Sequence, residues 1–275
     1  MKKPRLLFAL VTLLACWSAV GKDSCFECHR VMEGMSLKFT NDIHFSKSIS
    51  CANCHGGDVN ETNQNIAMNA SRGFKVRVTR QGVPEFCGKC HADAAFMAKY
   101  ESEPRVDQLA KYQVGVHGKL LASGRKRAAE CVDCHAVHTT RAISDSLSTA
   151  SPQRVSQTCG KCHAPTLEAF AGTKHGQLFK SKRLPGCTVC HASHDTAPAT
   201  AAMLTGADSV CIRCHRPGTK QAKVAEDMAQ VLAGLEAAGP GSKDALARAR
   251  IAVHTLNPEA MKKAAETVPA DSNDK

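Results

Sequence analysis

The sequence predicts a mainly α-helical protein with much irregular coil, few or no strands, and an interior that side chains fill only in part. Aromatic residues form 4% of the 275 positions, with 9 Phe, 2 Tyr and 1 Trp, although aromatic rings normally supply much of the area that a core buries. The chain has instead 15 Cys and 13 His. Alternating apolar runs are short, as in residues 75–79, so strands are not expected.

The N-terminus predicts export to the periplasm. A basic start, residues 1–5, precedes the largely apolar run from Leu6 to Ala15, which is too short to cross a bilayer and fits a secretory signal. Cleavage after Gly21 would release a soluble protein. Alternatively, the segment that ends at Cys16 resembles a lipobox, so that residues 1–15 are removed and Cys16 carries a lipid anchor. No later run approaches the roughly 18 apolar residues of a membrane span.

Fourteen cysteines fall into seven copies of Cys-x-x-Cys-His, the attachment signature of c-type haem. Two thiols at this spacing form thioethers to the two vinyl groups of one porphyrin, and the following His binds the iron on the proximal side. The thioether cysteines are Cys25, Cys28, Cys51, Cys54, Cys87, Cys90, Cys131, Cys134, Cys159, Cys162, Cys187, Cys190, Cys211 and Cys214. The proximal histidines are His29, His55, His91, His135, His163, His191 and His215.

Zinc sites, a redox dithiol and a disulfide scaffold are the competing interpretations of these cysteines. None of them requires a His after every pair. With 13 His in 275 residues, seven such coincidences have a chance on the order of one in a billion. The sequence therefore predicts seven haem c groups.

The formal charge of +11 by itself suggests a polyanionic partner. Removal of residues 1–21 takes away Lys2, Lys3 and Arg5 and leaves +8. Seven haems, each with two propionates, then bring the total to about +1 when ferric and about −6 when ferrous. A nucleic-acid partner is therefore not expected.

Six further histidines are candidates for the distal side of the irons: His44, His117, His138, His175, His194 and His254. Three of them precede a motif by seven to fourteen residues, and two of these three are followed by Gly. His138 and His194 follow a motif His by three, a helical turn that would turn them toward a neighbouring iron. His254 shares a predicted helix face with Leu246 and Val253 and is expected to serve the last motif. For each of them an ordinary surface or capping His is the alternative.

An internal repeat organises the motifs. Residues 87–138 recur as residues 159–194, residues 25–58 form a degenerate copy, and residues 211–215 are a single motif. In the degenerate copy Asp58 stands where the trailing His is expected, so thirteen histidines are one too few for seven irons. Met32 is a candidate for the missing ligand, whose thioether would raise that haem's potential. Apolar packing of Met32, an amine ligand and an open iron are the alternatives.

The elements and boundaries follow from turn and cap residues. Residues 22–216 are expected to form the haem domain, with loops over 59–73 and 143–153 and helices after several motifs, for example over 92–100. Residues 217–266 are expected to form three helices. The first covers 220–237, the second runs from the cap Ser242 to about Leu256, and the third starts at Asn257-Pro258. Residues 267–275 are expected to be a disordered tail.

The motif pattern resembles multihaem cytochromes c of the doubled-CxxCH type, found among periplasmic electron carriers of metal- and sulfur-respiring bacteria. The resemblance covers most of residues 23–216 and is carried by Cys25–Asp58, the connector from Ala67-Met68 to Pro84, Phe86–His138, Cys159–His194 and Cys211–His215. It implies largely bis-His, low-potential haems stacked within tunnelling contact. Asp58 departs from the pattern.

We therefore expect a periplasmic protein that relays single electrons through seven haems and is not itself an enzyme. Its partners would be a membrane quinol-oxidising complex or a terminal reductase, and it would touch the membrane only through a lipid on Cys16. One alternative is a multihaem reductase of the nitrite or hydroxylamine type that uses the incompletely ligated haem. Another is a structural conduit subunit of a larger respiratory complex.

Overall fold

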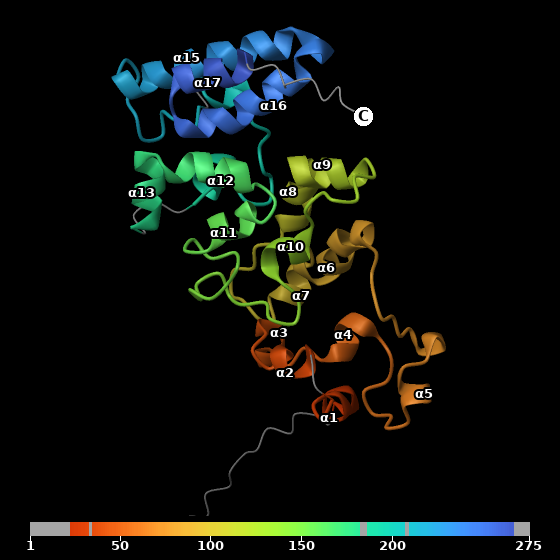
Figure 1. The fold of residues 1–275 in the computed structure, drawn as a ribbon. Coiled ribbons are helices and arrows are strands. Elements are labelled where there is room, and N and C mark those ends of the chain that lie inside the picture. The colour runs from red at the N-terminus through yellow and green to blue at the C-terminus, as the bar shows by residue number, and fades with distance from the viewer. Residues whose placement is uncertain (1–22, 33–34, 182–185, 207–208, 267–275) are drawn as a thin grey trace, which may run out of the picture. The chain divides into compact units, whose positions relative to one another are not determined.

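Short helices joined by coil make up this computed structural model, which describes residues 23–32, 35–181, 186–206 and 209–266. No residue in these ranges belongs to a strand (Figure 1), which confirms the mainly helical fold with much coil. The chain divides into unit 1, formed by residues 1–37 and 48–76, and unit 2, formed by residues 38–47 and 77–275. The predicted export signal, Cys16 and the predicted tail lie outside the described residues.

Unit 1 contains short helices around the first two motifs. They are α1 (Ser24–His29), α4 (Cys51–His55), α5 (Gln64–Ala67) and the 3₁₀ turn η1 (Ala70–Arg72), and the division between the units falls within α2 (Met35–Phe39). The expectation of a plain loop over 59–73 was wrong, since α5 and η1 lie there. Asn63 and Asn69 cap these two turns by accepting hydrogen bonds from the N–H groups of Asn65 and Ser71.

Unit 2 carries the other five motifs and the C-terminal helices. Its elements are α3 (Ile43–Ser46), η2 (Arg80–Gly82), α6 (Val83–His91), α7 (Ala94–Met97), α8 (Gln108–Val114), α9 (Val116–Ala122), α10 (Cys131–His135), α11 (Val155–Gly160), α12 (Ala164–Ala171), α13 (Lys174–Lys180), α14 (Thr188–His191), η3 (Ala201–Met203), α15 (Lys220–Ala237), η4 (Gly239–Ser242), α16 (Lys243–Ala252), η5 (Val253–Thr255) and α17 (Pro258–Glu266).

The helix predicted over 92–100 is wrong in its extent. The motif itself is helical, because α6 runs to His91, and the chain then breaks before α7. Asp93 causes the break: its backbone is extended and its side chain accepts a hydrogen bond from the Phe96 N–H at 3.0 Å, which starts a new helix. Residues 143–153 contain no helix.

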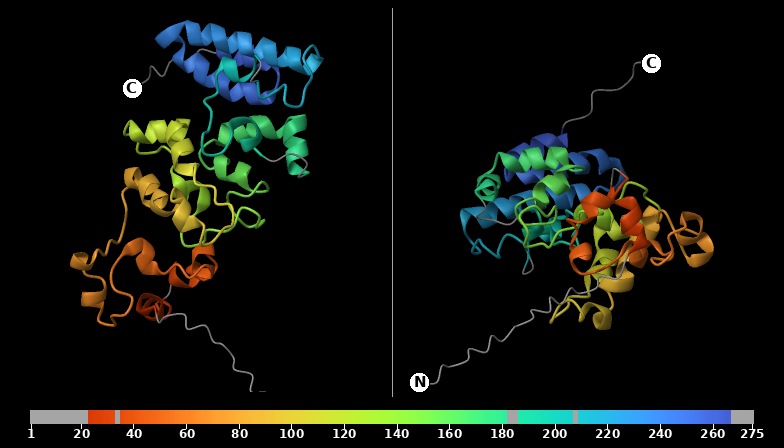
Figure 2. Two further views of the ribbon diagram at one scale, coloured as in Figure 1. Left: turned by 180° about the vertical axis from the view of Figure 1, so that it is seen from behind. Right: turned by 90° about the horizontal axis from the view of Figure 1, so that it is seen from below.

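Three C-terminal helices hold most of the side-chain core. α15 begins and ends at the predicted residues, and α17 starts at Pro258 after Asn257, whose side chain accepts from the Glu259 N–H. Nine of the twelve buried apolar residues in the described chain lie on α15, α16, η5 and α17, which pack together (Figure 2). The region of the motifs thus has few buried apolar side chains of its own, in accord with the low aromatic content.

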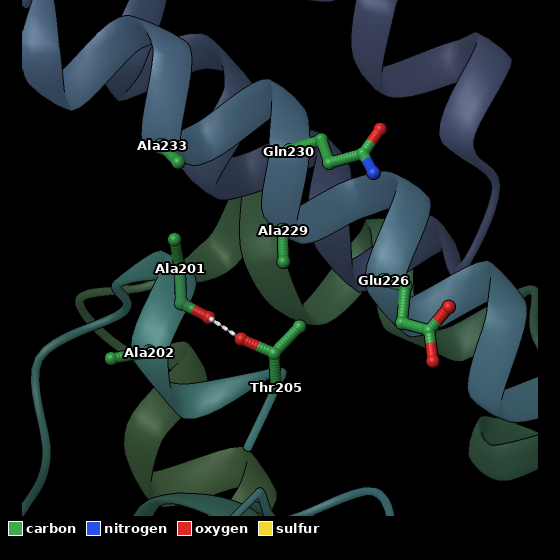
Figure 3. A pocket seen from close by; sticks show the side chains of 7 residues that line it. All are labelled: Ala201, Ala202, Thr205, Glu226, Ala229, Gln230 and Ala233. Atoms are coloured by element: carbon green, nitrogen blue, oxygen red, sulfur yellow. Dashed lines mark hydrogen bonds between the residues drawn. The ribbon is translucent and has the colours of Figure 1, made fainter. Parts of the chain in front are cut away.

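One hollow of about 360 Å³ lies between η3 and α15. Figure 3 shows its lining, which is mostly alanine methyl groups with Glu226 and Gln230 at one side. None of its lining residues is a His or Cys, so it is separate from the motif side chains. Within the described ranges no helix combines the length and the apolar character that a membrane crossing needs.

Candidate functional site

Each of the seven motifs forms a turn or a short helix. In the fifth, sixth and seventh motifs the N–H of the motif His donates to the carbonyl of the first Cys, at 2.9 to 3.0 Å. One helical turn places the thiols and the imidazole on the same side of the chain. The first Cys of every motif is half-buried and the second is exposed in six, and none of the fourteen is in a disulfide. The thiols are therefore available for covalent attachment.

Five of the motif histidines face a histidine from elsewhere in unit 2. The ring centroids of His44 and His91 lie 5.9 Å apart, those of His117 and His163 6.2 Å, those of His135 and His194 6.0 Å, those of His175 and His215 5.8 Å, and those of His191 and His254 5.8 Å. In every pair, one ring belongs to a Cys-x-x-Cys-His motif and the other does not. The partners are 40 to 63 positions apart in the chain, so tertiary folding brings them together.

This spacing fits one metal ion between the two rings. A metal–nitrogen bond of about 2 Å on each side, together with about 1 Å from nitrogen to ring centre, places the two centroids about 6 Å apart. Among the described residues no three His, Cys, Asp or Glu side chains cluster to hold a bare metal ion. Two histidines bound on opposite sides of an ion would leave its remaining positions to a planar group, and the motif thiols could anchor one. The residues present therefore fit haem c.

The structure brings five of the six spare histidines to a motif His, and it differs from the sequence on one of them. His254 meets His191 of the sixth motif rather than His215 of the last, because His215 faces His175. The remaining histidine of the six is His138, whose ring meets the Phe39 ring edge-on with the two ring centroids 6.2 Å apart.

Two predicted features of the first repeat lie in unit 1. Met32 is 59% exposed. Asp58, which stands in the place of a trailing His, pairs with Arg72 and accepts from the Asn60 N–H. Asp58 thus has a structural role in holding the loop that follows α4.

Burial favours the neutral form of several of the paired imidazoles. Desolvation first, and the facing histidine second, lower the pKa of His117, His175 and His254. The same two causes lower the pKa of His91 and His135. A neutral imidazole keeps the nitrogen lone pair that binds a metal.

Hydrogen bonds at Nδ1 orient several of these rings. His254 Nδ1 donates to the Arg250 carbonyl at 3.0 Å, and His191 Nδ1 donates to the Ala197 carbonyl at 3.4 Å. His44 Nδ1 donates to the Asp42 carboxylate at 2.8 Å. Because these acceptors have no proton to give, the proton lies on Nδ1 and the lone pair of Nε2 is free for a metal.

Glycines of the repeat let the helices approach closely enough to form the pairs. A Cβ on Gly118, next to His117, would lie 2.0 Å from the Tyr112 carbonyl oxygen. The equivalent Gly176, next to His175, would place a Cβ 2.3 Å from the Phe170 oxygen. The repeated His-Gly is visible in the sequence, but the close approach that requires it is a property of the folded chain.

The glycine inside the Cys-Gly-Lys-Cys-His motifs has a matching role. A Cβ on Gly88 would lie 2.4 Å from Leu109 Cδ2, and a Cβ on Gly160 would lie 2.4 Å from Leu167 Cδ2. The third and fifth motifs are thus packed alike against a leucine of a later helix. The sequence repeat of the two Cys-Gly-Lys-Cys-His motifs is therefore accompanied by the same glycine–leucine packing in both.

The residue after the second motif of each repeat has the same unusual backbone. Gly56, Ala136 and Ala192 all have φ between +60° and +68° with ψ within 21° of 180°. Glycine alone adopts this region without strain. It ends the helix at the motif His, so His138 and His194 do not continue that helix as the spacing of three suggested.

Consecutive motifs also adjoin through their cysteines. Cys131 donates a hydrogen bond to Cys87, which lowers the pKa of Cys87 and raises that of Cys131. Cys159 likewise donates a hydrogen bond to Cys187, which lowers the pKa of Cys187 to about 6 and raises the pKa of Cys159.

Weaker electrostatic contacts join further neighbouring motifs. Cys162 raises the pKa of Cys134, after burial and two carboxylates, and Cys211 raises that of Cys190, after burial. The thiols of the third to seventh motifs therefore lie next to one another in chain order. Within unit 1, Cys51 adds to the burial and the Asp23 carboxylate that raise the pKa of Cys25 to about 11.

Comparison with known families gives two matches. Residues 43–164 match the family described as cytochrome c3, and residues 158–236 match the family described as cytochrome c554 and c-prime. Each match covers less than half of the 275 residues, and together they run without a gap from 43 to 236 and include six of the seven motifs. No curated protein and no solved structure matches the chain.

Proposed function

We propose that this chain, a multihaem cytochrome c with covalently bound c-type haem, holds seven haems and relays single electrons between redox proteins. The observation that carries the proposal is the set of five facing histidine pairs, each with a centroid distance near 6 Å. An iron with a histidine on both sides has no open position for a substrate. Such sites exchange electrons and do not bind reactants.

The roles of the side chains follow from this arrangement. The motif cysteines would tether the porphyrin, the motif histidines would each bind its iron, and His44, His117, His175, His194 and His254 would supply the second iron ligand. When bound, the haem supplies reversible one-electron exchange at its iron. Hydrogen bonds at Nδ1 would hold three of these rings in place, His44 through a carboxylate and His191 and His254 through backbone carbonyls, which limits reorganisation at their irons.

The contacts between cysteines support a path in chain order. The third to seventh motifs adjoin their neighbours through their thiols, for example Cys87 with Cys131 and Cys159 with Cys187. Porphyrins tethered at adjacent thiols would have neighbouring edges. We infer a linear relay through these five haems.

A reductase is the second candidate, and the histidine count favours it at one site. Seven motif histidines and six others can complete at most six irons, and five of the six others are used within unit 2. The five pairs leave the motifs of His29 and His55 with a single further histidine in the sequence, His138. The iron with an incomplete ligand set therefore belongs to the motif of His29 or to that of His55, and Met32 remains a candidate ligand.

Location and partners complete the proposal. The protein would work in the periplasm, held there by a lipid on Cys16 or released after Gly21, and would take electrons from a membrane quinol-oxidising complex or pass them to a terminal reductase. Incorporation of labelled palmitate into the wild-type chain but not into a Cys16→Ser variant is the expected result for the anchor. Absence of label from the wild type would exclude it.

Three measurements on the purified holoprotein test the relay. Mass spectrometry is expected to show the mature chain plus seven haem groups, and EPR of the ferric protein is expected to show at least six low-spin irons. Electron transfer is expected without turnover of nitrite or hydroxylamine. A stoichiometric high-spin signal that disappears with nitrite, together with reduction of nitrite, would favour the reductase instead.

A further inference from the structure

Asp42 is a buried carboxylate in direct contact with a distal histidine. Its side chain is 2% exposed, and its Oδ1 accepts from His44 Nδ1 at 2.8 Å and from the His44 N–H at 2.9 Å. Its Oδ2 accepts from the Thr140 N–H at 2.6 Å, while the Ile43 N–H donates to the Thr140 carbonyl at 2.7 Å. Three hydrogen bonds thus hold the carboxylate, one of them from the His44 ring, and a fourth joins the two backbones beside it.

We propose that Asp42 is a positioning residue that makes His44 an electron-rich ligand and gives the third haem, attached at Cys87 and Cys90, a lower potential than the sixth. This inference rests on the proposed function, in which His44 and His91 are the two axial ligands of that haem.

The physical reason is the charge at the hydrogen-bond acceptor. A carboxylate that accepts the Nδ1 proton gives the imidazole partial imidazolate character and raises its basicity as a ligand. A more basic ligand stabilises ferric iron over ferrous iron, and hydrogen bonding around the ligands is one of the means by which a protein sets a haem potential. Burial of the carboxylate strengthens the effect, because its charge is poorly screened.

The sixth haem offers an internal comparison. Its ligands His191 and His254 both donate from Nδ1 to backbone carbonyls, which carry no net charge. The third haem has the same ligand type and a similar centroid distance, 5.9 Å against 5.8 Å. The two pairs also differ in the angle between their rings, 78° against 20°, so the test changes the charge of Asp42 while the ligand pair stays the same.

The variant Asp42→Asn removes the charge and keeps the size of the side chain and an acceptor for the Thr140 N–H. We expect about a tenfold rise in the ratio of ferrous to ferric iron at one haem, equivalent to about 59 mV in a one-electron titration. Loss of a partner behind a metal ligand typically changes metal affinity or activity by about 10–100-fold, and the expected ratio takes the lower end of that range as its order of magnitude. The EPR spectrum should stay low-spin, which separates this effect from loss of the ligand.

Asp145→Asn is the matched control. Asp145 also lies in unit 2 and accepts from a backbone N–H and an arginine, but has no histidine in contact. It should leave all seven potentials unchanged. A folded, fully loaded Asp42→Asn protein with no shifted potential would overturn the proposal, and so would an equal shift from Asp145→Asn.

Two further measurements keep the test decisive. If Asp42→Asn does not mature, a redox titration of the wild-type protein followed by EPR replaces it. The 78° angle between the rings of His44 and His91 predicts a near-axial low-spin signal for the third haem. As the potential is lowered, this signal should disappear after every rhombic low-spin signal. Reduction of all near-axial species first would contradict the proposal. His44→Gly tests the underlying function separately, because it must create one high-spin haem if His44 is a ligand.

Discussion

The ring centroids of His254 and His191 lie 5.8 Å apart, and the angle between the two ring planes is 20°. His254 is in the 3₁₀ turn η5 that ends α16, next to Val253 in the C-terminal core. α12 packs against both α16 and η5. The C-terminal helices therefore do more than cover the motif region, because they bring a ring to the sixth motif.

Removal of that ring should open one iron. In His254→Gly we expect one of the low-spin ferric haems to become high-spin, with no loss of haem from the chain, because the thioethers at Cys187 and Cys190 remain. EPR and mass spectrometry measure the two quantities. Added imidazole should restore the low-spin signal, and a spectrum unchanged from wild type would show that His254 is not a ligand.

The angles between paired rings predict two spectroscopic classes. The rings of His135 and His194 lie 12° apart and those of His191 and His254 20° apart, whereas those of His44 and His91 lie 78° apart. Parallel imidazoles act on the same iron d orbital and give rhombic low-spin EPR signals. Crossed imidazoles leave two d orbitals nearly degenerate and give near-axial signals with a much larger highest g value. We expect both classes together, and a spectrum with one class alone would contradict the ring geometry.

Close approach at the His-Gly positions predicts a steric cost. Gly118→Ala and Gly176→Ala would each place a Cβ within 2.3 Å of a backbone oxygen, and overpacking of this kind typically costs about 1–3 kcal/mol. We also expect a high-spin fraction in each variant, since the adjacent His117 or His175 must move.

Gly234→Ala is the control for this pair. Gly234 lies within α15, and no atom comes within 4 Å of the position that an alanine Cβ would take there, so alanine should stabilise the helix by about 0.5–1 kcal/mol. Denaturant unfolding of the holoprotein measures the free energies. Equal effects at Gly118 and Gly234 would show that the close approach does not exist.

Backbone strain after the motif histidines predicts a stabilising substitution. Ala136 and Ala192 occupy a region that costs a residue other than glycine about 1–3 kcal/mol. Glycine removes that strain but loses about 0.5–1 kcal/mol to chain entropy, so Ala136→Gly and Ala192→Gly should each stabilise by about 1 kcal/mol.

Two comparison variants check this interpretation by denaturant unfolding. Ala233→Gly, on the exposed side of α15, should destabilise by about 1 kcal/mol. Gly56→Ala should be strongly destabilising, because its Cβ would lie 2.3 Å from the Gly73 oxygen. Destabilisation by Ala136→Gly would mean that the strain is absent.

The predicted C-terminal helices, and the two wrong predictions over 59–73 and 92–100, show how much of the helical structure local sequence signals determine. The Thr219 side chain accepts a hydrogen bond from the Ala222 N–H at the start of α15, and Gly239-Pro240-Gly241 follows its end. Both signals are local, so the bounds of α15 could be predicted from the sequence. Asn63 and Asn69 favour a loop by composition, although Asn also caps helices and does so here. The helix expected over 92–100 is shortened to α7, because Asp93 caps a new helix after α6.

The covalent chemistry follows from the amino-acid sequence alone, because two thiols and an imidazole within five residues meet whatever the rest of the chain does. The number of candidate ligands and the shortage of one follow from it as well. Which histidine faces which motif depends on the folded chain, since His254 meets His191 and His194 meets His135 across 63 and 59 positions. The pairing of His254 with His191 accompanies the packing of α12 against α16 and η5, a contact between residues far apart in the chain that no local pattern in the sequence reveals.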